Sequence, residues 1–369
     1  MEKVYQIALT LVDGVGSVLF RQLINHFGNA EAVFNAPKER LIKLSGIGKM
    51  IVENITNNKN LLEKAEKIVN DSEAKNISII LSSDETYPKR LKALYDAPAI
   101  LYYSGNANLN HTKTIGIVGT RQATEYGKKI TTEIVEGLKS HNPSIISGLA
   151  YGIDIIAHKA AIEQNLPTVA VVANGLDITY PASHKKYTEA IKNNGAIISE
   201  NSIGMQPIAS LFLARNRIIA GLSDLVIVVE SASKGGALVT AEFANNYHRD
   251  VFAVPGMLGN KYSEGTNKLI SSNKAQIYTK VEDLITALNW DINISEKTSS
   301  TSNVEIDLTA FTDEEAQVIT LLRTNNEMQI DDLSWQSNIS LNRLAGLLLN
   351  LEFQEIVRAL PGKKFTLKI

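Results

Sequence analysis

The sequence predicts an α/β protein whose core is a Rossmann-like parallel sheet, with a small helical domain before it and a winged helix after it. Short runs of isoleucine, valine and alanine alternate with amphipathic segments between about residues 73 and 288. Apolar residues at helical spacing precede this region, and three helical segments followed by two β-like runs end the chain. Strands that are apolar throughout are buried on both faces, as in a parallel sheet between two helical layers.

Residues 1–72 are expected to form the helical domain, because apolar side chains there recur every three or four positions. Two Gly-x-Gly turns, at residues 14–16 and 46–48, each precede a predicted helix. Paired turns of this kind resemble helix-hairpin-helix (SAM-like) units, whose turn amides can touch a DNA backbone. Lys49 lies close to the second turn, but no basic residue lies within four positions of the first. A DNA contact and a purely structural role both stay open.

Residues 73–288 are expected to form the sheet domain. The apolar runs predict strands at residues 114–118, 144–146, 168–173, 196–199, 225–229 and 251–254, with helices at 153–162, 185–192, 211–219 and 238–248. Strands that alternate with helices form crossover units, which predicts a parallel order. In such sheets ligands collect at the carboxyl ends of the strands, where loops meet helix N-termini that favour anions.

The polar stretch 289–308 predicts a flexible linker, and residues 309–369 predict a separate domain. That domain has expected helices at 314–322, 330–336 and 341–351 and β-like runs at 355–360 and 364–369. Three helices followed by a hairpin is the order of a winged helix. Eight acidic residues outnumber six basic ones in this domain, whereas a domain that binds duplex DNA usually has a row of basic residues on one face. We therefore expect a protein contact or an auxiliary role for the winged helix.

Composition limits the classes of partner. Lys and Arg number 37 against 39 Asp and Glu, for a net charge of −2, so a nucleic-acid site must be a local patch. Cysteine is absent and the six histidines lack metal-binding spacing, so no metal centre is expected. No run approaches the roughly 20 apolar residues of a membrane span, and no signal segment opens the chain. These observations predict a cytoplasmic protein without membrane contact.

Glycine or a small polar residue follows nearly every predicted strand. The four loops contain Gly119, Thr120 and Arg121; Ser147, Gly148 and Gly152; Asn174 and Gly175; and Lys234, Gly235 and Gly236. Glycine lets backbone amides approach a phosphate closely, and arginine forks suit phosphate oxygens and stack on bases. Arg215, Asn216 and Arg217 interrupt an otherwise apolar helix, where an unpaired charge is costly. Together these residues predict an anion site, against the alternative that the glycines serve only turn geometry.

The sequence offers little for catalysis. A Gly-x-Gly-x-x-Gly fingerprint and a Walker A motif are both missing, which disfavours nicotinamide redox chemistry and intrinsic ATP hydrolysis. Asp154 and His158 stand one helical turn apart, so they could couple as acid and base or could orient a loop, and both interpretations stay open. No catalytic residue, no cofactor and no enzymatic activity are expected.

The motifs taken together resemble one family, the DNA-processing protein A (DprA/Smf) family. The matching stretches are IVGTRQATEYG, ISGLAYGIDIIAHKAAI, VANGLDITYP, GAIISE, FLARNRIIAGLSDLVIVVESASKGGALVTAEFA, FAVPG and GTNKLI. The resemblance implies a protein that binds and protects incoming single-stranded DNA, forms a homodimer and loads the recombinase RecA during natural transformation and recombination. It also implies that the strand's path is lined by Arg121, Ser147, Gly148, Arg215, Arg217 and Lys234.

Two segments depart from the family pattern, and a third, residues 235–242, suggests an alternative function. Residues 271–275 read Ser-Ser-Asn-Lys-Ala where the family usually has a Gly-Ala pair, and Lys234 stands where an arginine is usual. Residues 235–242 are similar to the GGxGTxxE signature of nucleotide phosphoribohydrolases, with Glu242 as a general acid or base. Val239 occupies the place of that signature's glycine before the threonine. The partial match leaves nucleotide hydrolysis as the alternative function, and the missing glycine counts against it.

Overall fold

The structure is a computed structural model that describes residues 1–57, 59–290, 308, 311–360 and 364–368. The chain forms two compact units, 1–292 and 293–369. The predicted linker, 289–308, lies almost wholly outside the described residues. Among the described residues, no helix combines the length and apolar composition needed to cross a bilayer.

The first unit is built on a nine-stranded sheet in the order β1-β2-β6-β5-β4-β3-β7-β8-β9. The strands are β1 (Ser78–Leu81), β2 (Ile100–Gly105), β3 (Thr114–Val118), β4 (Ser144–Ser147), β5 (Thr168–Val171), β6 (Gly195–Ser199), β7 (Leu225–Val228), β8 (Asp250–Ala253) and β9 (Gln276–Ile277). Strands β3 to β8 are mutually parallel, as predicted, and the unpredicted β9 pairs parallel with β8. Strands β1 and β2 extend the sheet in antiparallel pairing beside β6. The strand order reverses between β3 and β7, which is where a parallel sheet opens a crevice for ligands.

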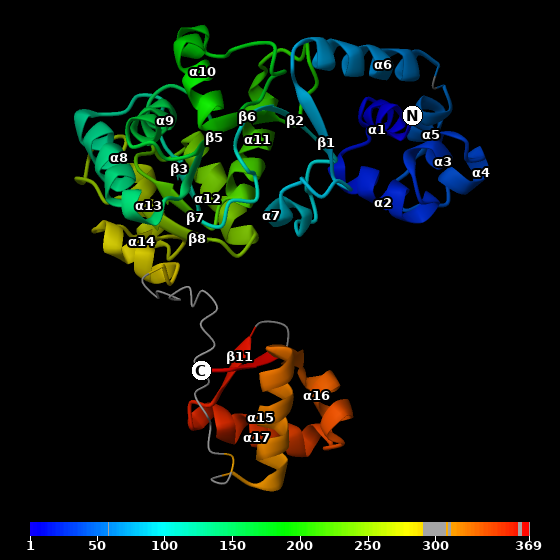
Figure 1. Ribbon diagram of the computed structural model, residues 1–369. Coiled ribbons are helices and arrows are strands. Elements are labelled where there is room, and N and C mark those ends of the chain that lie inside the picture. Colours follow the sequence, from blue (N-terminus) through cyan, green and yellow to red (C-terminus); the bar gives the residue numbers. More distant parts are fainter. Residues whose placement is uncertain (58, 291–307, 309–310, 361–363, 369) are drawn as a thin grey trace. The chain divides into compact units, whose positions relative to one another are not determined.

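Helices cover both faces of this sheet (Figure 1). They are α7 (Lys89–Lys92), α8 (Glu125–Gly137), α9 (Ile153–Glu163), α10 (Lys185–Asn193), α11 (Ala209–Leu222), α12 (Gly236–Asn246), α13 (Glu264–Ser271) and α14 (Val281–Ala287), with 3-10 turns at Lys139–His141 and Ala182–His184. Ile145 packs in the core under α8, α9 and α14, while its neighbour Ile146 packs in the core under α11 and α12. Alternating side chains of one apolar strand thus fill two separate cores, which is why the strands contain so few polar residues.

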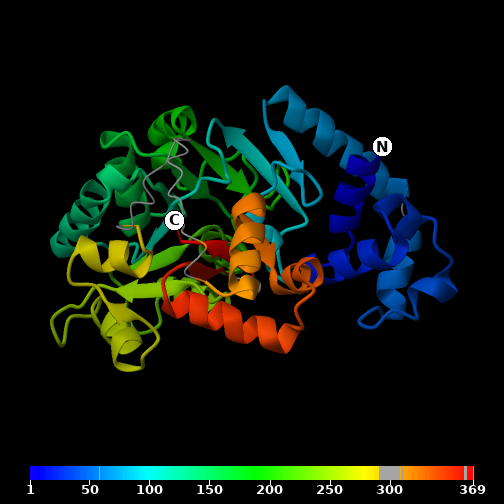
Figure 2. The same cartoon turned by 60° about the horizontal axis from the view of Figure 1, so that its bottom comes forward.

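The N-terminal helices form a small domain beside the β1 edge of the sheet (Figures 1 and 2). They are α1 (Glu2–Thr10), α2 (Ser17–Phe27), α3 (Ala30–Phe34), α4 (Lys38–Leu41), α5 (Lys49–Thr56) and α6 (Lys59–Ala74). Gly14 and Gly46 have φ of +90° and +86°, which explains why each predicted Gly-x-Gly turn requires glycine. The core of this domain also contains Ile79 of β1 and Ile100 of β2. The helical domain and the edge of the sheet therefore share one hydrophobic core.

The second unit has the order of a winged helix. It contains α15 (Asp313–Asn325), β10 (Glu327–Gln329), α16 (Ile330–Ser337), α17 (Leu341–Phe353), β11 (Val357–Leu360) and β12 (Lys364–Leu367), with the strands in the order β10-β12-β11. Thr312 and Glu315 form a capping box at the start of α15. Arg343, the arginine of α17, is ion-paired with Glu314 at 2.8 Å. The predicted fold class, a Rossmann-like sheet with helical and winged-helix additions, is confirmed.

Candidate nucleic-acid interface

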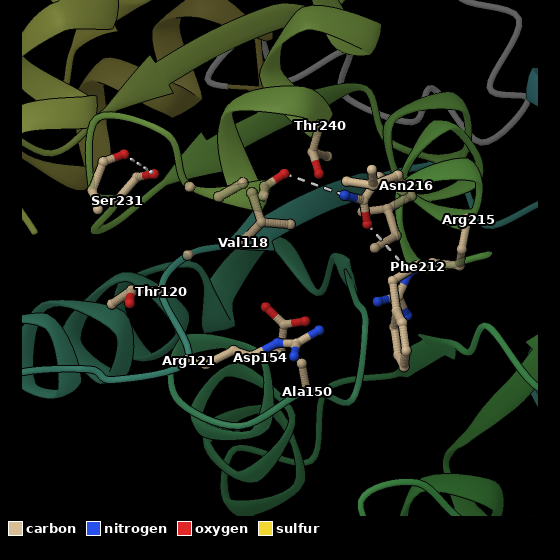
Figure 3. A pocket seen from close by; sticks show the side chains of 17 residues that line it. Val118, Thr120, Arg121, Ala150, Asp154, Phe212, Arg215, Asn216, Ser231 and Thr240 are labelled. Carbon is tan, nitrogen blue, oxygen red and sulfur yellow. Dashed lines mark hydrogen bonds between the residues drawn. The ribbon is translucent and has the colours of Figure 1, made fainter. Parts of the chain in front are cut away.

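A pocket of about 220 Å³ lies at the point where the strand order reverses. Its walls come from the loops after β3 and β7 and from the helices α9, α11 and α12. Seven of the residues predicted from the sequence line it: Gly119, Thr120, Arg121, Arg215, Asn216, Gly235 and Gly236. Figure 3 shows Arg121 and Asp154 across the pocket from Thr240. The structure thus brings together loops that are more than 100 residues apart in the sequence.

Backbone amides face this pocket at the start of α12. Gly235 is the N-cap of that helix, and among the described residues the amides of Gly236 and Ala237 donate no hydrogen bond. Both residues line the pocket, and a Cβ atom on Gly236 would meet no heavy atom within 4 Å, so space lies open beside its Cα. Unpaired amides in the first turn carry the positive end of the helix dipole and bind anions.

Two arginines contribute positive charge in different ways. Arg215 is buried, and its guanidinium donates to the carbonyl oxygens of Gly148, at 2.7 Å, and of Val171. Burial lowers its pKa to about 10, so it stays charged at neutral pH. Arg121 is exposed, and its guanidinium lies over the ring of Phe212, 5.2 Å from the centroid. Arg215 therefore supports the pocket wall, while Arg121 is accessible to a ligand.

Asp154 is a buried carboxyl group in the same wall. Burial raises its pKa, whereas the Arg215 guanidinium lowers it. A Cβ atom on Gly148 would lie 2.6 Å from Asp154 Oδ2 and 2.6 Å from an Arg215 nitrogen, so only glycine fits between these two groups. Arg215 therefore offsets only part of the effect of burial, and the pKa of Asp154 stays above its usual value.

His158 does not form an acid–base couple with Asp154, because no hydrogen bond joins the two side chains among the described residues. The Nδ1 of His158 lies 2.7 Å from Thr168 Oγ1, and that hydroxyl itself donates to the carbonyl of Ile145. His158 Nδ1 is thus the donor of this pair. Burial lowers the pKa of His158 to about 3, so the ring is neutral and structural.

Other predicted residues lie behind or beside the pocket. Ser147 is buried and donates to the carbonyl of Ile117 at 2.6 Å, while Gly152 has φ of +76° in the turn before α9. Asn174 donates to the carbonyl of Ile178 in its own loop, Gly175 donates to the carbonyl of Met205 in the loop after β6, and neither residue lines the pocket.

Three charged residues singled out from the sequence also lie outside the pocket. Lys234 is exposed in the loop between β7 and α12. Glu242, the acid or base of the alternative function, is exposed on α12. Arg217 points to a different cluster, where its guanidinium binds both carboxylate oxygens of Glu200 at 3.0 and 2.6 Å.

Sequence reasoning missed the pocket residues Phe212, Ser231 and Thr240. Phe212 precedes Arg215 by about one helical turn, and this spacing of an aromatic and a basic residue was an available signal for a shared face. Ser231 and Thr240 offer no such signal, because hydroxyl residues at a strand end or in a helix are common.

Comparison with known proteins places this architecture in a family. Residues 78–289 match the family model described as DNA recombination-mediator protein A, and residues 305–363 match the DprA winged helix domain. Protein Smf of Synechocystis sp. is 36% identical over 293 residues, which covers 78% of this chain and 73% of that protein. DNA processing protein DprA of Streptococcus pneumoniae is 40% identical over 202 residues, covering 55% and 71%.

Two solved structures are similar as well. The X-ray structure of DprA from Streptococcus pneumoniae has a TM-score of 0.65 and 32% identity, covering 77% of this chain and 97% of that one. A Helicobacter pylori DprA structure, described as giving insights into a single-stranded DNA binding mode, has a TM-score of 0.53 and 34% identity, covering 58% and 96%. The predicted resemblance is confirmed, and the chain belongs to the DNA recombination-mediator protein A (DprA/Smf) family.

Proposed function

We propose that the pocket at the β3/β7 crevice binds single-stranded DNA. The observation that carries this proposal is the juxtaposition of the exposed Arg121, stacked over Phe212, with the unpaired amides of Gly236 and Ala237. The arginine and the aromatic ring suit a base and its phosphate, and the amides suit a second phosphate oxygen. A relative's structure described by its single-stranded DNA binding supports the same assignment.

The size of the pocket favours a single strand. About 220 Å³ is below the roughly 300 Å³ at which sites for whole small molecules begin, so the pocket accepts a phosphate or a base. An unpaired strand can turn one nucleotide into such a recess, whereas a duplex keeps its bases stacked and its phosphates on a regular cylinder. The proposed contacts are Gly119, Thr120, Arg121, Asn216, Gly235 and Gly236, with Lys234 on the rim and with Ser147, Gly148, Gly152 and Arg215 supporting them from behind.

We assign this binding to the domain of residues 73–288 and an auxiliary role to the winged helix of residues 309–369. Asp154 has no hydrogen bond to His158 among the described residues, and Glu242 lies outside the pocket, so neither carboxyl group belongs to an acid–base couple of the kind that hydrolysis requires. Binding without chemistry is the function that this arrangement supports. Incubation of the protein with nucleoside monophosphates should release no free base, and release of base would establish the phosphoribohydrolase alternative.

Fluorescence anisotropy with single-stranded and duplex oligonucleotides of equal length, titrated with salt, tests the proposal. We expect preference for the single strand, and weaker binding by Arg121→Ala. Arg40→Ala is a matched control, because Arg40 is an exposed arginine on α4 and does not line the pocket. Equal affinity for both DNA forms at matched salt would refute the proposal.

Loading of RecA and formation of a homodimer are proposed on family resemblance. RecA filament formation on DNA coated with single-strand binding protein should accelerate when this protein is added. Arg121→Ala should remove that acceleration, because loading requires the protein to hold the strand. Unchanged RecA kinetics with the wild-type protein would separate DNA binding from loading.

A further inference from the structure

Arg217 lies on the face of α11 opposite the DNA pocket. Two helical positions separate it from Arg215, which is a rotation of about 200° on an α-helix. Arg215 and Phe212 line the pocket, whereas Arg217 lines a separate cavity of about 660 Å³ between the N-terminal helices and the sheet. The helix therefore presents one arginine to each side.

The donors of Arg217 are already used by protein acceptors. Its guanidinium binds Glu200 through two hydrogen bonds of 3.0 and 2.6 Å and donates to Ser17 Oγ at 3.1 Å. Its Nε lies 3.9 Å from Asp96 Oδ2. The exposed fractions of these side chains are low, 12% for Arg217, 18% for Glu200 and 14% for Asp96. A phosphate could reach Arg217 only by displacing two carboxylates in a weakly hydrated site, which is unfavourable.

The groups around Arg217 come from both sides of a domain boundary. Ser17 is the first residue of α2 in the N-terminal domain, and Glu200 directly follows β6. Asp96 also accepts hydrogen bonds of 2.8 and 2.7 Å from the hydroxyl of Tyr247, which caps the end of α12. A further contact crosses the same boundary, since Arg21 of α2 donates to the carbonyl of Leu94 at 2.7 Å.

We infer that Arg217 is a positioning residue that ties the N-terminal domain to α11 and thereby holds the pocket residues on the other face of that helix. This inference rests on the proposed function, because the pocket must bind DNA for its geometry to matter. The cluster also reaches the end of α12, whose first turn supplies the pocket amides. The N-terminal domain would then strengthen DNA binding without touching the strand, since a tilt of α11 moves Phe212 and Arg215 together.

Three variants of the full chain separate this role from a DNA contact. Glu200→Gln removes the charge that holds Arg217 and leaves the arginine in place. If Arg217 contacts DNA, this variant frees it and binding should strengthen. If Arg217 positions α11, the DNA affinity should fall by about three- to tenfold, with an unchanged slope of log affinity against log salt. Ser17→Ala removes only the hydrogen bond across the boundary, and Arg217→Met removes the cation while its unbranched chain still packs.

Hydrogen exchange of the α2 amides provides the second measurement. Glu200→Gln and Ser17→Ala should each accelerate this exchange, by about two- to tenfold for a single hydrogen bond. Because coupling is reciprocal, saturating single-stranded DNA should slow α2 exchange in the wild type and much less in Glu200→Gln. A cooperative thermal transition in each variant shows that it folds. If Arg217→Met does not fold, Ser17→Ala provides the test, because it leaves every charge in place.

The inference is overturned if Glu200→Gln binds DNA as tightly as the wild type or more tightly. It is equally overturned if Arg217→Met flattens the salt slope by about 0.7, the value expected when one phosphate of a single strand is no longer neutralised. Failure of the proposed function gives a different result, namely unchanged binding by Arg121→Ala. In that case α2 exchange still reports whether Arg217 joins the two domains.

Discussion

Gly236→Ala should stabilise the protein and weaken its binding to DNA. Gly236 is the first residue of α12, has no positive φ, and a Cβ atom there would meet no heavy atom within 4 Å. Replacing such a glycine by alanine stabilises a protein by about 0.4–1 kcal/mol, because the unfolded chain loses conformational freedom. For a unit of this size, that corresponds to an increase in Tm of roughly 1–4 °C.

The same methyl group would occupy space at a residue that lines the pocket, beside the amides proposed to bind phosphate. Loss of one hydrogen bond to a charged group costs about 1.5–3 kcal/mol, which is roughly a 10- to 100-fold loss of affinity. Thermal unfolding followed by circular dichroism gives the first quantity, and anisotropy with a single-stranded oligonucleotide gives the second. The two effects have opposite signs, so a general loss of structure cannot imitate them.

Gly346→Ala is the matched control. Gly346 lies within α17 of the winged helix, and a Cβ atom there also meets nothing within 4 Å. This substitution should stabilise the second unit and leave DNA binding unchanged. Wild-type affinity in Gly236→Ala would refute the assignment of the α12 amides as phosphate ligands, and a lowered Tm would refute the inference that space is open at this position.

Three further predictions concern charge, pH and association. Arg121→Ala should reduce the slope of log affinity against log salt concentration by roughly 0.7 for each phosphate that Arg121 neutralises, and an unchanged slope would show that Arg121 does not bind phosphate. His158 has a pKa of about 3 when folded and about 6.5 when unfolded, so its contribution to stability is complete above pH 6.5 and declines as the pH falls toward 3. In denaturant unfolding, the free energy of unfolding of His158→Gln should therefore fall less with decreasing pH than that of the wild type, by up to about 1.4 kcal/mol per pH unit. Parallel plots of this free energy against pH for the two proteins would contradict the prediction. Light scattering should report about twice the 40.3 kDa chain mass, and a monomer at micromolar concentration would exclude the proposed homodimer.

Strands β3 to β8 could be predicted because each contains a short apolar run, whereas the two exposed residues of β9, Gln276 and Ile277, give no such signal. The antiparallel strands β1 and β2 could not, because β2 pairs with β6, and Tyr102 of β2 lies opposite Ser199. Nothing local in residues 100–105 indicates a partner so far along the chain. Strand β10 could not be predicted for a different reason, since its three residues include a single buried side chain, Met328.

The lining of the pocket could be predicted in part from glycines and Arg121, and less well from the other arginines. Arg215 and Arg217 have the same charge in the same helix, so the sequence gives no basis for assigning them different roles. The structure separates them because two helical positions face opposite directions, and because the carboxylates of Asp96 and Glu200 are distant in sequence from Arg217. Phe212 is apolar like its neighbours in the helix, so only its spacing from Arg215 distinguishes it in the sequence.

The shared core of the N-terminal helices and β1–β2 has a consequence during synthesis on the ribosome. The helices and this hairpin emerge first and can collapse together, but the free edge of β2 is covered only when β6 arrives about 90 residues later, between Gly105 and Gly195. At roughly 5–20 residues per second, that edge is open for about 5–18 s. An unpaired strand edge is a template for pairing with other chains. Chaperone binding to nascent chains should thus concentrate on lengths between these two strands.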